Sequence, residues 1–230
     1  MITQNLGYYL SSQPGRFSVI EADHIHDLNQ RVSLLEEHIG FKLEPILHYA
    51  LRARDNYTLE HSNRVVTLSE VIGKHLNLQK REMEVLSLAA SFHDIGKIGI
   101  PDNILLKPGT LTREEYEGIK VHSTIGANML RTLANPLLDE VAVGVLHHHE
   151  QWDGKGYPDG LKGEEIPIVS RIIAVVDAYD AMTTTRSYRR EMSKIEALKM
   201  IESESGKQFC PKAVEVVLDI CRSGKFSWFK

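Results

Sequence analysis

Hydrophobic residues recur every three or four positions along most of the chain, which is the period of a helix that buries one face. In the first such segment, residues 27–51, the pattern predicts a helix interrupted near Gly40. The same period predicts further helices over these segments: 58–78, 79–95, Thr112 onward, 139–149, 169–184, 193–204 and Pro211 onward. Because no alternating segment of useful length accompanies them, the pattern predicts an all-α fold.

A few residues mark helix boundaries and loops. Two pairs have the spacing of a capping box: Thr112 with Glu115, and Ser193 with Glu196. Gly96 is a candidate helix stop, and residues 97–111 are expected to form a loop. Residues 151–167 contain four glycines and two prolines, which predicts a long structured loop. Loops of that length inside a compact domain are usually functional.

Composition narrows the class of protein. The 230 residues are 42% hydrophobic and 25% charged, as expected of a soluble domain with a sizeable core. The formal net charge of −4 argues against duplex nucleic acid as a partner. The sequence has no apolar run of about 18 residues, so no membrane span is expected. The N-terminus lacks secretory features and there are only two cysteines, which together indicate a reducing, cytoplasmic location.

The chain is expected to divide near residue 50. Residues 1–50 read as an N-terminal lead-in and helical segment, and residues 51–230 as one domain. The N-terminal helix could cover that domain, form a homodimer or join the chain to a sensor.

Histidine is the unusual residue, with 11 copies, and it suggests chemistry. His93 and Asp94 are adjacent at an expected helix end, so their side chains point about 100° apart. His93 can therefore face one metal ion while the carboxylate of Asp94 reaches between two. Lys97 faces the same site if helical geometry continues through the next turn.

Other candidate ligands fall at inward or terminal helix positions. They are His61, His122, His148, His149 and Asp177. Asp177 lies in an apolar helical run, where an unpaired carboxylate is costly. The set predicts a helical cage around two metal ions, and imidazole with carboxylate ligands suits Fe, Mn, Zn or Ni better than Ca.

Ordered motifs extend this pattern over most of the chain, from about Tyr57 to Lys212. They are HSNRV (61–65), HDIGK (93–97), IPDNILLKPGTLT (100–112), His122, HHE (148–150), DGKGYP (153–158), VVDAYDAM (175–182) and RSYRR (186–190). With these motifs the chain resembles the HD-GYP subgroup of the HD-domain phosphohydrolases. The resemblance implies a catalytic HD-domain helical bundle over residues 51–230, with extra helices and a long GYP loop.

The resemblance also implies roles for individual residues. His61, His93, Asp94 and Asp177 match the ligands of one metal, and His122, His148 and His149 match those of a second, with Asp94 as the bridge. Lys97 matches a catalytic lysine at the scissile phosphate. Tyr157, Arg186 and Arg189 match substrate-binding positions. Some members hold a third metal through a Glu where this chain has Tyr57, so a dinuclear site is expected.

Members of the subgroup hydrolyse cyclic di-GMP to pGpG and often to GMP, using a hydroxide that bridges two metals, usually Fe or Mn. Zn or Ni would also suit the ligands. Two alternatives stay open: hydrolysis of another cyclic dinucleotide, 3′,3′-cyclic GMP-AMP, and a regulatory module that binds diguanylate cyclase (GGDEF) domains.

Two further residues are expected to support the site, and a third is expected to take no part in it. Arg64 should pair with a core carboxylate, His147 should be a spectator, and Glu150 should orient a histidine.

Overall fold

The computed structural model describes residues 58–184 and 191–223, all within one compact unit that spans residues 49–230. Regular structure in these two ranges is helical, without a strand, which confirms the predicted all-α fold. The helix predicted over 27–51 lies outside the described residues, as do Arg186 and Arg189. The domain boundary near residue 50 stays a prediction.

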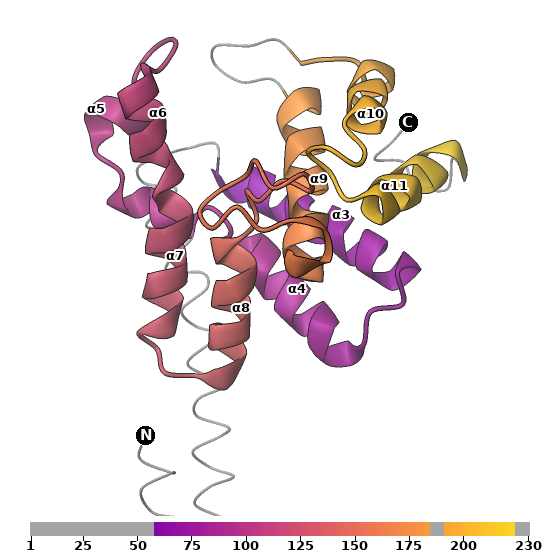
Figure 1. The fold of residues 1–230 in the computed structure, drawn as a ribbon, viewed down its shortest axis with the longest axis horizontal. Coiled ribbons are helices and arrows are strands. Elements are labelled where there is room, and N and C mark those ends of the chain that lie inside the picture. The colour runs from indigo at the N-terminus through magenta and orange to yellow at the C-terminus, as the bar shows by residue number, and fades with distance from the viewer. Residues whose placement is uncertain (1–57, 185–190, 224–230) are drawn as a thin grey trace, which may run out of the picture. The chain divides into compact units, whose positions relative to one another are not determined.

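The helices follow one another along the chain, and the long loop over 151–167 joins α8 to α9 (Figure 1). Their bounds are α3 Thr58–His75, α4 Lys80–Phe92, η1 Ile95–Gly99, α5 Asp102–Leu105, α6 Arg113–Lys120, α7 His122–Arg131, α8 Pro136–Leu146, η2 Gly163–Glu165, α9 Ile168–Thr183, α10 Lys194–Ser203 and α11 Pro211–Ser223. Both η1 and η2 are 3₁₀ turns.

The core forms where α3, α4, α8 and α9 pack together, with α7 against α8 and η1 on one side and α10 and α11 beyond α9 on the other (Figure 1). On α3, the predicted apolar face is buried, with Val65, Leu68 and Ile72 almost inaccessible to solvent. On α9, Ile172 and Ile173 are fully buried. Burying each such side chain stabilises the fold by about 1.5–3 kcal/mol relative to exposure.

Both predicted capping boxes are present. Thr112 Oγ1 accepts the N–H of Glu115 at 3.2 Å and begins α6, while the Ser193 side chain caps the N–H of Glu196 in α10. Because each cap satisfies backbone groups that a helix start leaves unpaired, it holds the boundary at that residue.

Several predicted boundaries were wrong. The helix expected over 79–95 ends at Phe92, and the helix from Thr112 is divided at Val121 into α6 and α7. The helix expected over 139–149 runs from Pro136 to Leu146. Just beyond each of the three helix ends, a histidine donates a hydrogen bond from Nδ1 to the backbone carbonyl three residues earlier. In a continuing helix that carbonyl would accept the backbone N–H four residues further on.

Gly96 has a different role from the predicted helix stop. It lies in η1, and a Cβ added there would be 1.8 Å from the carbonyl oxygen of His122. The glycine therefore permits η1 to approach the start of α7. The predicted loop over 97–111 also contains most of η1 and the whole of α5.

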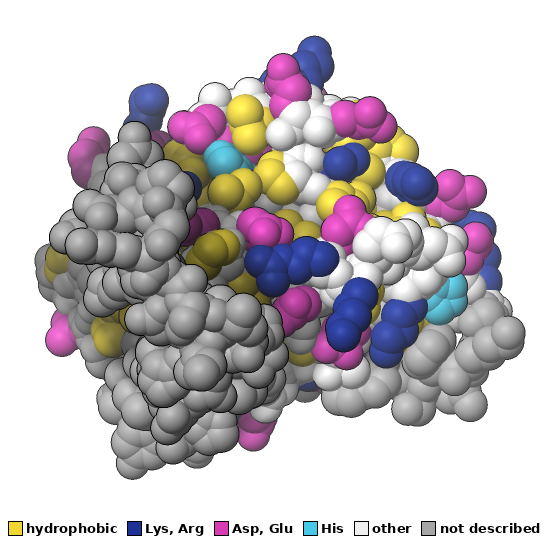
Figure 2. All heavy atoms as spheres, turned by 90° about the horizontal axis from the view of Figure 1, so that it is seen from below, with side chains coloured by type: hydrophobic (Ala, Val, Ile, Leu, Met, Phe, Trp, Pro, Cys, Tyr) yellow, Lys and Arg dark blue, Asp and Glu magenta, His cyan; other side chains and the backbone are white. Residues whose placement is uncertain are grey.

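The surface seen from below mixes both charge signs, with acidic and basic side chains among hydrophobic ones (Figure 2). The lower end of α8 carries Glu140, which accepts a 2.9 Å hydrogen bond from Arg81. Exposed pairs of this kind add little stability. None of the helices in the described ranges is both long enough and apolar enough to cross a bilayer.

Candidate metal centre

Side chains from five parts of the chain meet at one point among the core helices. They come from the first turn of α3, the end of α4, the start of α7, the turn after α8 and the middle of α9: His61, His93, Asp94, His122, His148, His149 and Asp177. All seven metal ligands expected from the sequence are therefore in one region.

The first group contains His61, His93 and Asp94, whose candidate ligand atoms all lie within 4.8 Å of one another. His61 Nε2 is 3.2 Å from His93 Nε2. Asp177 approaches the same point, because its Oδ1 is 3.3 Å from His61 Nε2. The side chains of His61, His93 and Asp94 are buried. The side chain of Asp177 is 23% exposed and forms the open side of the group.

The second group contains His122, His148 and His149, whose candidate ligand atoms also lie within 4.8 Å of one another. The Nε2 atoms of His122 and His148 are 3.4 Å apart. The ring of His149 lies 5.0 Å from that of His122 and 4.0 Å from that of His148 between centroids. The turn after α8 thus supplies two adjacent histidines to one group.

Asp94 lies between the two groups. Its Oδ1 is 3.5 Å from His122 Nε2, and its Oδ2 is 3.5 Å from His93 Nε2. Lys97 donates a 2.6 Å hydrogen bond to Asp94 Oδ2. Because η1 keeps the chain turning after Asp94, Lys97 faces the centre as the sequence suggested.

The histidines are oriented by their other ring nitrogens. The Nδ1 atoms of His93, His122 and His148 donate to backbone carbonyls of Ala90, Ile119 and Val145 at 2.8, 2.8 and 2.6 Å. In a neutral imidazole a proton on Nδ1 leaves a lone pair on Nε2. These bonds therefore direct the lone pairs of all three rings into the centre.

This arrangement fits a metal ion. Between His122 and His148, two Nε2 lone pairs face each other at 3.4 Å with both Nδ1 protons already donated elsewhere. Facing lone pairs repel unless a cation lies between them. Nitrogen ligands about 2.0–2.1 Å from one ion have a separation of this order. The donor set is imidazole and carboxylate, which suits a divalent transition metal.

Protonation tendencies agree with this fit. Burial, and after it the charge of His149, holds the pKa of His148 well below its usual value. Burial and then His122 lower the pKa of His149 to about 3. Both rings are therefore neutral near pH 7, the form that binds metals.

The first group favours a cation for another reason. Burial lowers the pKa of His61, but hydrogen bonds with Asp177 and Asp180 outweigh burial and raise it to about 9. Burial raises the pKa of Asp94, but Lys97 and then the surrounding histidines outweigh burial and hold it well below its usual value. The carboxylates are thus ionised at the point where the His61 and His93 rings meet.

Asp180 holds the His61 ring on the side opposite its Nε2. It accepts a 2.7 Å hydrogen bond from His61 Nδ1, and its two oxygens also accept from Arg64 Nε at 2.6 Å and Nη2 at 3.0 Å. This confirms the core carboxylate expected for Arg64. The spacing of Asp180, three residues after Asp177 on α9, was the only sequence signal for its position.

Tyr157 closes one side of the centre. Its ring stacks on His149 with centroids 4.8 Å apart and an interplanar angle of 29°. The ammonium group of Lys120 lies 5.4 Å from the Tyr157 ring centroid and 4.9 Å from that of Tyr116. Sequence reasoning missed Lys120 and Tyr116, because only the folded loop brings Tyr157 beside α6.

Glu150 does not have the role expected from the sequence. Its Oε1 accepts the backbone N–H groups of Asp159 and Gly160 at 2.8 and 3.0 Å, so it shapes the long loop rather than orienting a histidine. His147 points away from the centre and binds Asp159 through Nε2 at 2.9 Å.

Helix ends that gather histidines and aspartates around a buried point define a helical bundle with a candidate metal site. A family model described as HD domain matches residues 45–212, and the chain belongs to this family. This confirms the HD-domain family that the ordered motifs implied.

Two curated relatives and one solved structure place the chain more closely. It is 41% identical to the cyclic di-GMP phosphodiesterase of Thermotoga maritima over 214 residues, 89% of this chain and 58% of the relative. It is 35% identical to the Vibrio cholerae 3′3′-cGAMP-specific phosphodiesterase 2 over 74% of this chain and 33% of the relative. The crystal structure of V. cholerae V-cGAP3, a cyclic GMP-AMP phosphodiesterase, aligns with a TM-score of 0.58 and 26% identity, covering 78% of this chain and 49% of that one.

Proposed function

We propose that this chain is a metal-dependent phosphodiesterase that hydrolyses cyclic di-GMP to pGpG, to GMP or to both. The observation that carries the proposal is the position of Asp94 between the two groups of candidate ligands. Its Oδ2 lies 3.5 Å from Nε2 of His93 in the first group, and its Oδ1 lies 3.5 Å from Nε2 of His122 in the second. The names of the relatives support the substrate class. The chain spans 58% of the length of the T. maritima relative, so the activity of the whole protein is part of this proposal.

Two divalent ions would be held by the two groups. His61, His93, Asp94 and Asp177 would bind one ion, and His122, His148 and His149 the other, with Asp94 bridging. Iron or manganese is proposed first, and zinc or nickel also suits the ligands. When bound, such a pair supplies a hydroxide near neutral pH and stabilises charge on the phosphate oxygens.

Lys97 would act on the substrate as a cation. Its ammonium group already lies 2.6 Å from Asp94 Oδ2, within the centre, so a phosphate that reaches Asp94 also reaches Lys97. A positioned cation stabilises the charge that builds on phosphoryl oxygens during in-line attack. Asp94 would stay ionised throughout, because its pKa lies well below its usual value.

Tyr157 would guide a base of the substrate. Its ring is held in place by stacking on His149 at the edge of the centre, and an aromatic ring there suits stacking against a guanine. Arg186 and Arg189, outside the described residues, are proposed to bind the substrate phosphates.

Hydrolysis of 3′,3′-cyclic GMP-AMP is the second candidate. It is favoured by two relatives with that name in Vibrio cholerae, which are 35% and 38% identical to this chain. A regulatory role through diguanylate cyclase (GGDEF) domains, and a homodimer through the N-terminal helix, are compatible with either activity.

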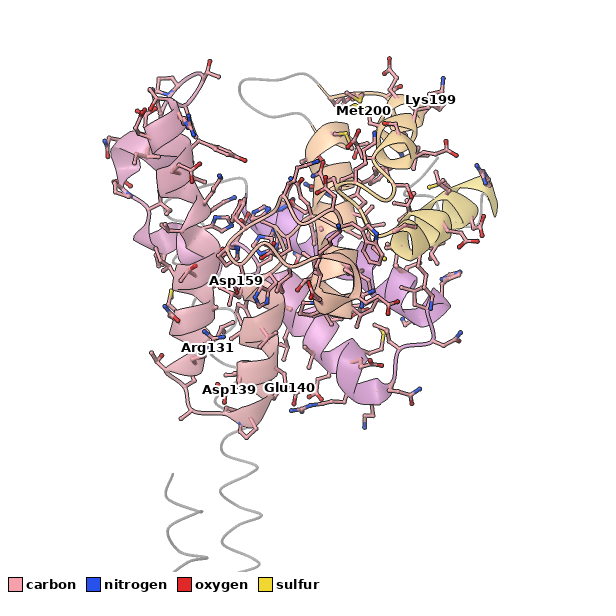
Figure 3. All side chains as sticks on the ribbon, viewed as in Figure 1. Arg131, Asp139, Glu140, Asp159, Lys199 and Met200 are labelled. Atoms are coloured by element: carbon pink, nitrogen blue, oxygen red, sulfur yellow. The ribbon has the colours of Figure 1, made fainter. Side chains whose placement is uncertain are left out.

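The proposal is tested by purifying the chain without oxygen, loading it with Fe²⁺ or Mn²⁺ and identifying products from both cyclic dinucleotides. We expect cyclic di-GMP turnover that Asp94→Asn abolishes, with loss of bound metal. Asp139→Asn is the matched control, because it makes the same chemical change at the far end of α8 (Figure 3). Binding of cyclic di-GMP without hydrolysis in the loaded protein would refute the enzymatic proposal and favour the regulatory one.

A further inference from the structure

A second group of metal-ligating side chains lies outside the candidate centre. His147, Glu150 and Asp159 each offer one ligand atom, and these atoms lie within 4.8 Å of one another. His147 and Glu150 follow the carboxyl end of α8, and Asp159 lies on the long loop that passes over that end (Figure 3). The group therefore joins a helix end to the loop that carries Tyr157.

Glu150 contains the informative atom. Its side chain is almost fully buried, and Oε1 is satisfied by two backbone N–H groups of the loop. Its Oε2 is buried and has no hydrogen-bond partner among the described residues. A buried carboxylate oxygen without a donor is costly, so a native structure is expected to supply a proton donor or a cation there.

His147 presents a second ligand atom. Its Nδ1 donates to the carbonyl of Val143 at 3.0 Å, which leaves the Nε2 lone pair facing Asp159 Oδ2 at 2.9 Å. A neutral histidine in this tautomer has no proton to give to Asp159. Two arrangements resolve the contact: a protonated His147 paired with Asp159, or a metal ion bound by both.

The ion pair accounts for the His147–Asp159 contact alone, whereas a metal ion also accounts for the buried carboxylate of Glu150. A proton on His147 satisfies Asp159 but leaves Glu150 Oε2 without a partner. An ion bound by all three residues neutralises both carboxylates and uses the lone pair of His147. The side chain of Asp159 is 56% exposed, so water can complete the coordination sphere from the open side.

We propose that His147, Glu150 and Asp159 bind one divalent transition-metal ion, separate from the candidate dinuclear centre. One imidazole and two carboxylates are typical Zn²⁺ ligands, and Zn²⁺ binds such sites more tightly than Mn²⁺ or Fe²⁺. The ion fastens the loop to the end of α8. Tyr157 lies two residues before Asp159 and stacks on His149, so the ion also holds Tyr157 in place at the side of the candidate centre. The inference stands on these three residues and does not depend on the proposed reaction.

The test is a titration of Zn²⁺ into the full chain, which is first stripped of metal. Calorimetry measures the number of ions bound and their affinity. His93→Ala with His122→Ala removes ligands from both groups of the candidate centre, and circular dichroism checks that this variant is folded. We expect it to retain one Zn²⁺ per chain, bound at least tenfold more weakly after Asp159→Asn is added. Glu164→Gln, an exposed acid of the same loop, is the matched control and should leave the affinity unchanged.

A second measurement keeps the test decisive if the double variant does not fold. In the otherwise unchanged chain, Asp159→Asn should lower the number of tightly bound Zn²⁺ ions by one, and Zn²⁺ should slow hydrogen exchange at the Asp159 and Gly160 amides. Loss of cyclic dinucleotide turnover in both chains would bear on the proposed function alone. Equal zinc counts and affinities with and without Asp159→Asn would overturn the inference and leave the His147–Asp159 ion pair.

Discussion

The support of His61 by Asp180 can be tested with the substitution Asp180→Asn. The carboxylate accepts from three N–H groups, one on His61 and two on Arg64, and uses both oxygens to do so. An amide has one acceptor oxygen and one NH₂ group, so at least one of those donors must face another donor. The variant therefore keeps the size of Asp180 and removes its ability to hold both partners.

The expected magnitude follows from these contacts. Hydrogen bonds to a charged group contribute about 1.5–3 kcal/mol each when both partners are largely removed from water. Asp180 is 4% and Arg64 22% exposed, so little discount for solvent applies. We expect a loss of about 1.5–3 kcal/mol in the free energy of unfolding. Residues that orient a ligand histidine commonly change metal affinity by about 10–100-fold, and we expect a loss in this range for the His61 group.

The assay combines urea unfolding with metal titration against a competing chelator. Glu140→Gln is the control, because it breaks an arginine–carboxylate pair at the surface, where both side chains are about half exposed. That variant should stay within about 0.5 kcal/mol of the unchanged chain. Asp180→Asn could change the free energy of unfolding and the metal affinity no more than Glu140→Gln does. That result would show that Asp180 does not position His61.

Three further predictions concern the centre and its edge. Lys97→Met should lower turnover by about 10²–10³-fold while metal content, read by elemental analysis, stays the same; a parallel loss of metal would mean that Lys97 acts by holding Asp94. Tyr157→Phe should retain substrate affinity and Tyr157→Ala should raise KM, since only the second removes the stacking ring; equal KM values in steady-state assays would contradict that role. The metal-free protein should be most stable near pH 6.5. Below that pH, His149, with its pKa lowered to about 3 by burial and then His122, binds fewer protons folded than unfolded, so stability falls by up to about 1.4 kcal/mol per pH unit. Above it, His61, with its pKa raised to about 9, binds more protons folded, so its contribution is lost as the pH rises from 6.5 to 9. In thermal unfolding across pH 4–10 after chelation, the absence of a stability maximum near pH 6.5 would contradict these shifts.

Sequence periodicity could predict the helices because burial of one face decides where they form. The apolar face of α3 and both capping boxes follow directly from residue spacing. Helix ends were harder to predict, because the ends at Phe92, Lys120 and Leu146 depend on which group binds a particular carbonyl. The competing groups there are histidine side chains, whose orientation is set by the centre they face.

The same distinction applies to the candidate site. The sequence brought the seven proposed ligands together because helix positions and motifs show which side chains point inward. It could not show that Glu150 binds the backbone of its own loop, since that contact requires the chain to return over nine residues. His147 looked like a spectator for the same reason: its partner, Asp159, becomes a neighbour only in the folded loop.

The contact between Gly96 and α7 sets the spacing of the candidate centre. Gly96 follows Asp94 by two residues, and the carbonyl that a Cβ would strike belongs to His122, a proposed ligand of the other ion. A side chain at residue 96 would push η1 and α7 apart, and with them the two sets of ligands on either side of Asp94. A residue outside both ligand groups therefore helps to set the distance between them, and this position should tolerate replacement as poorly as a candidate ligand does.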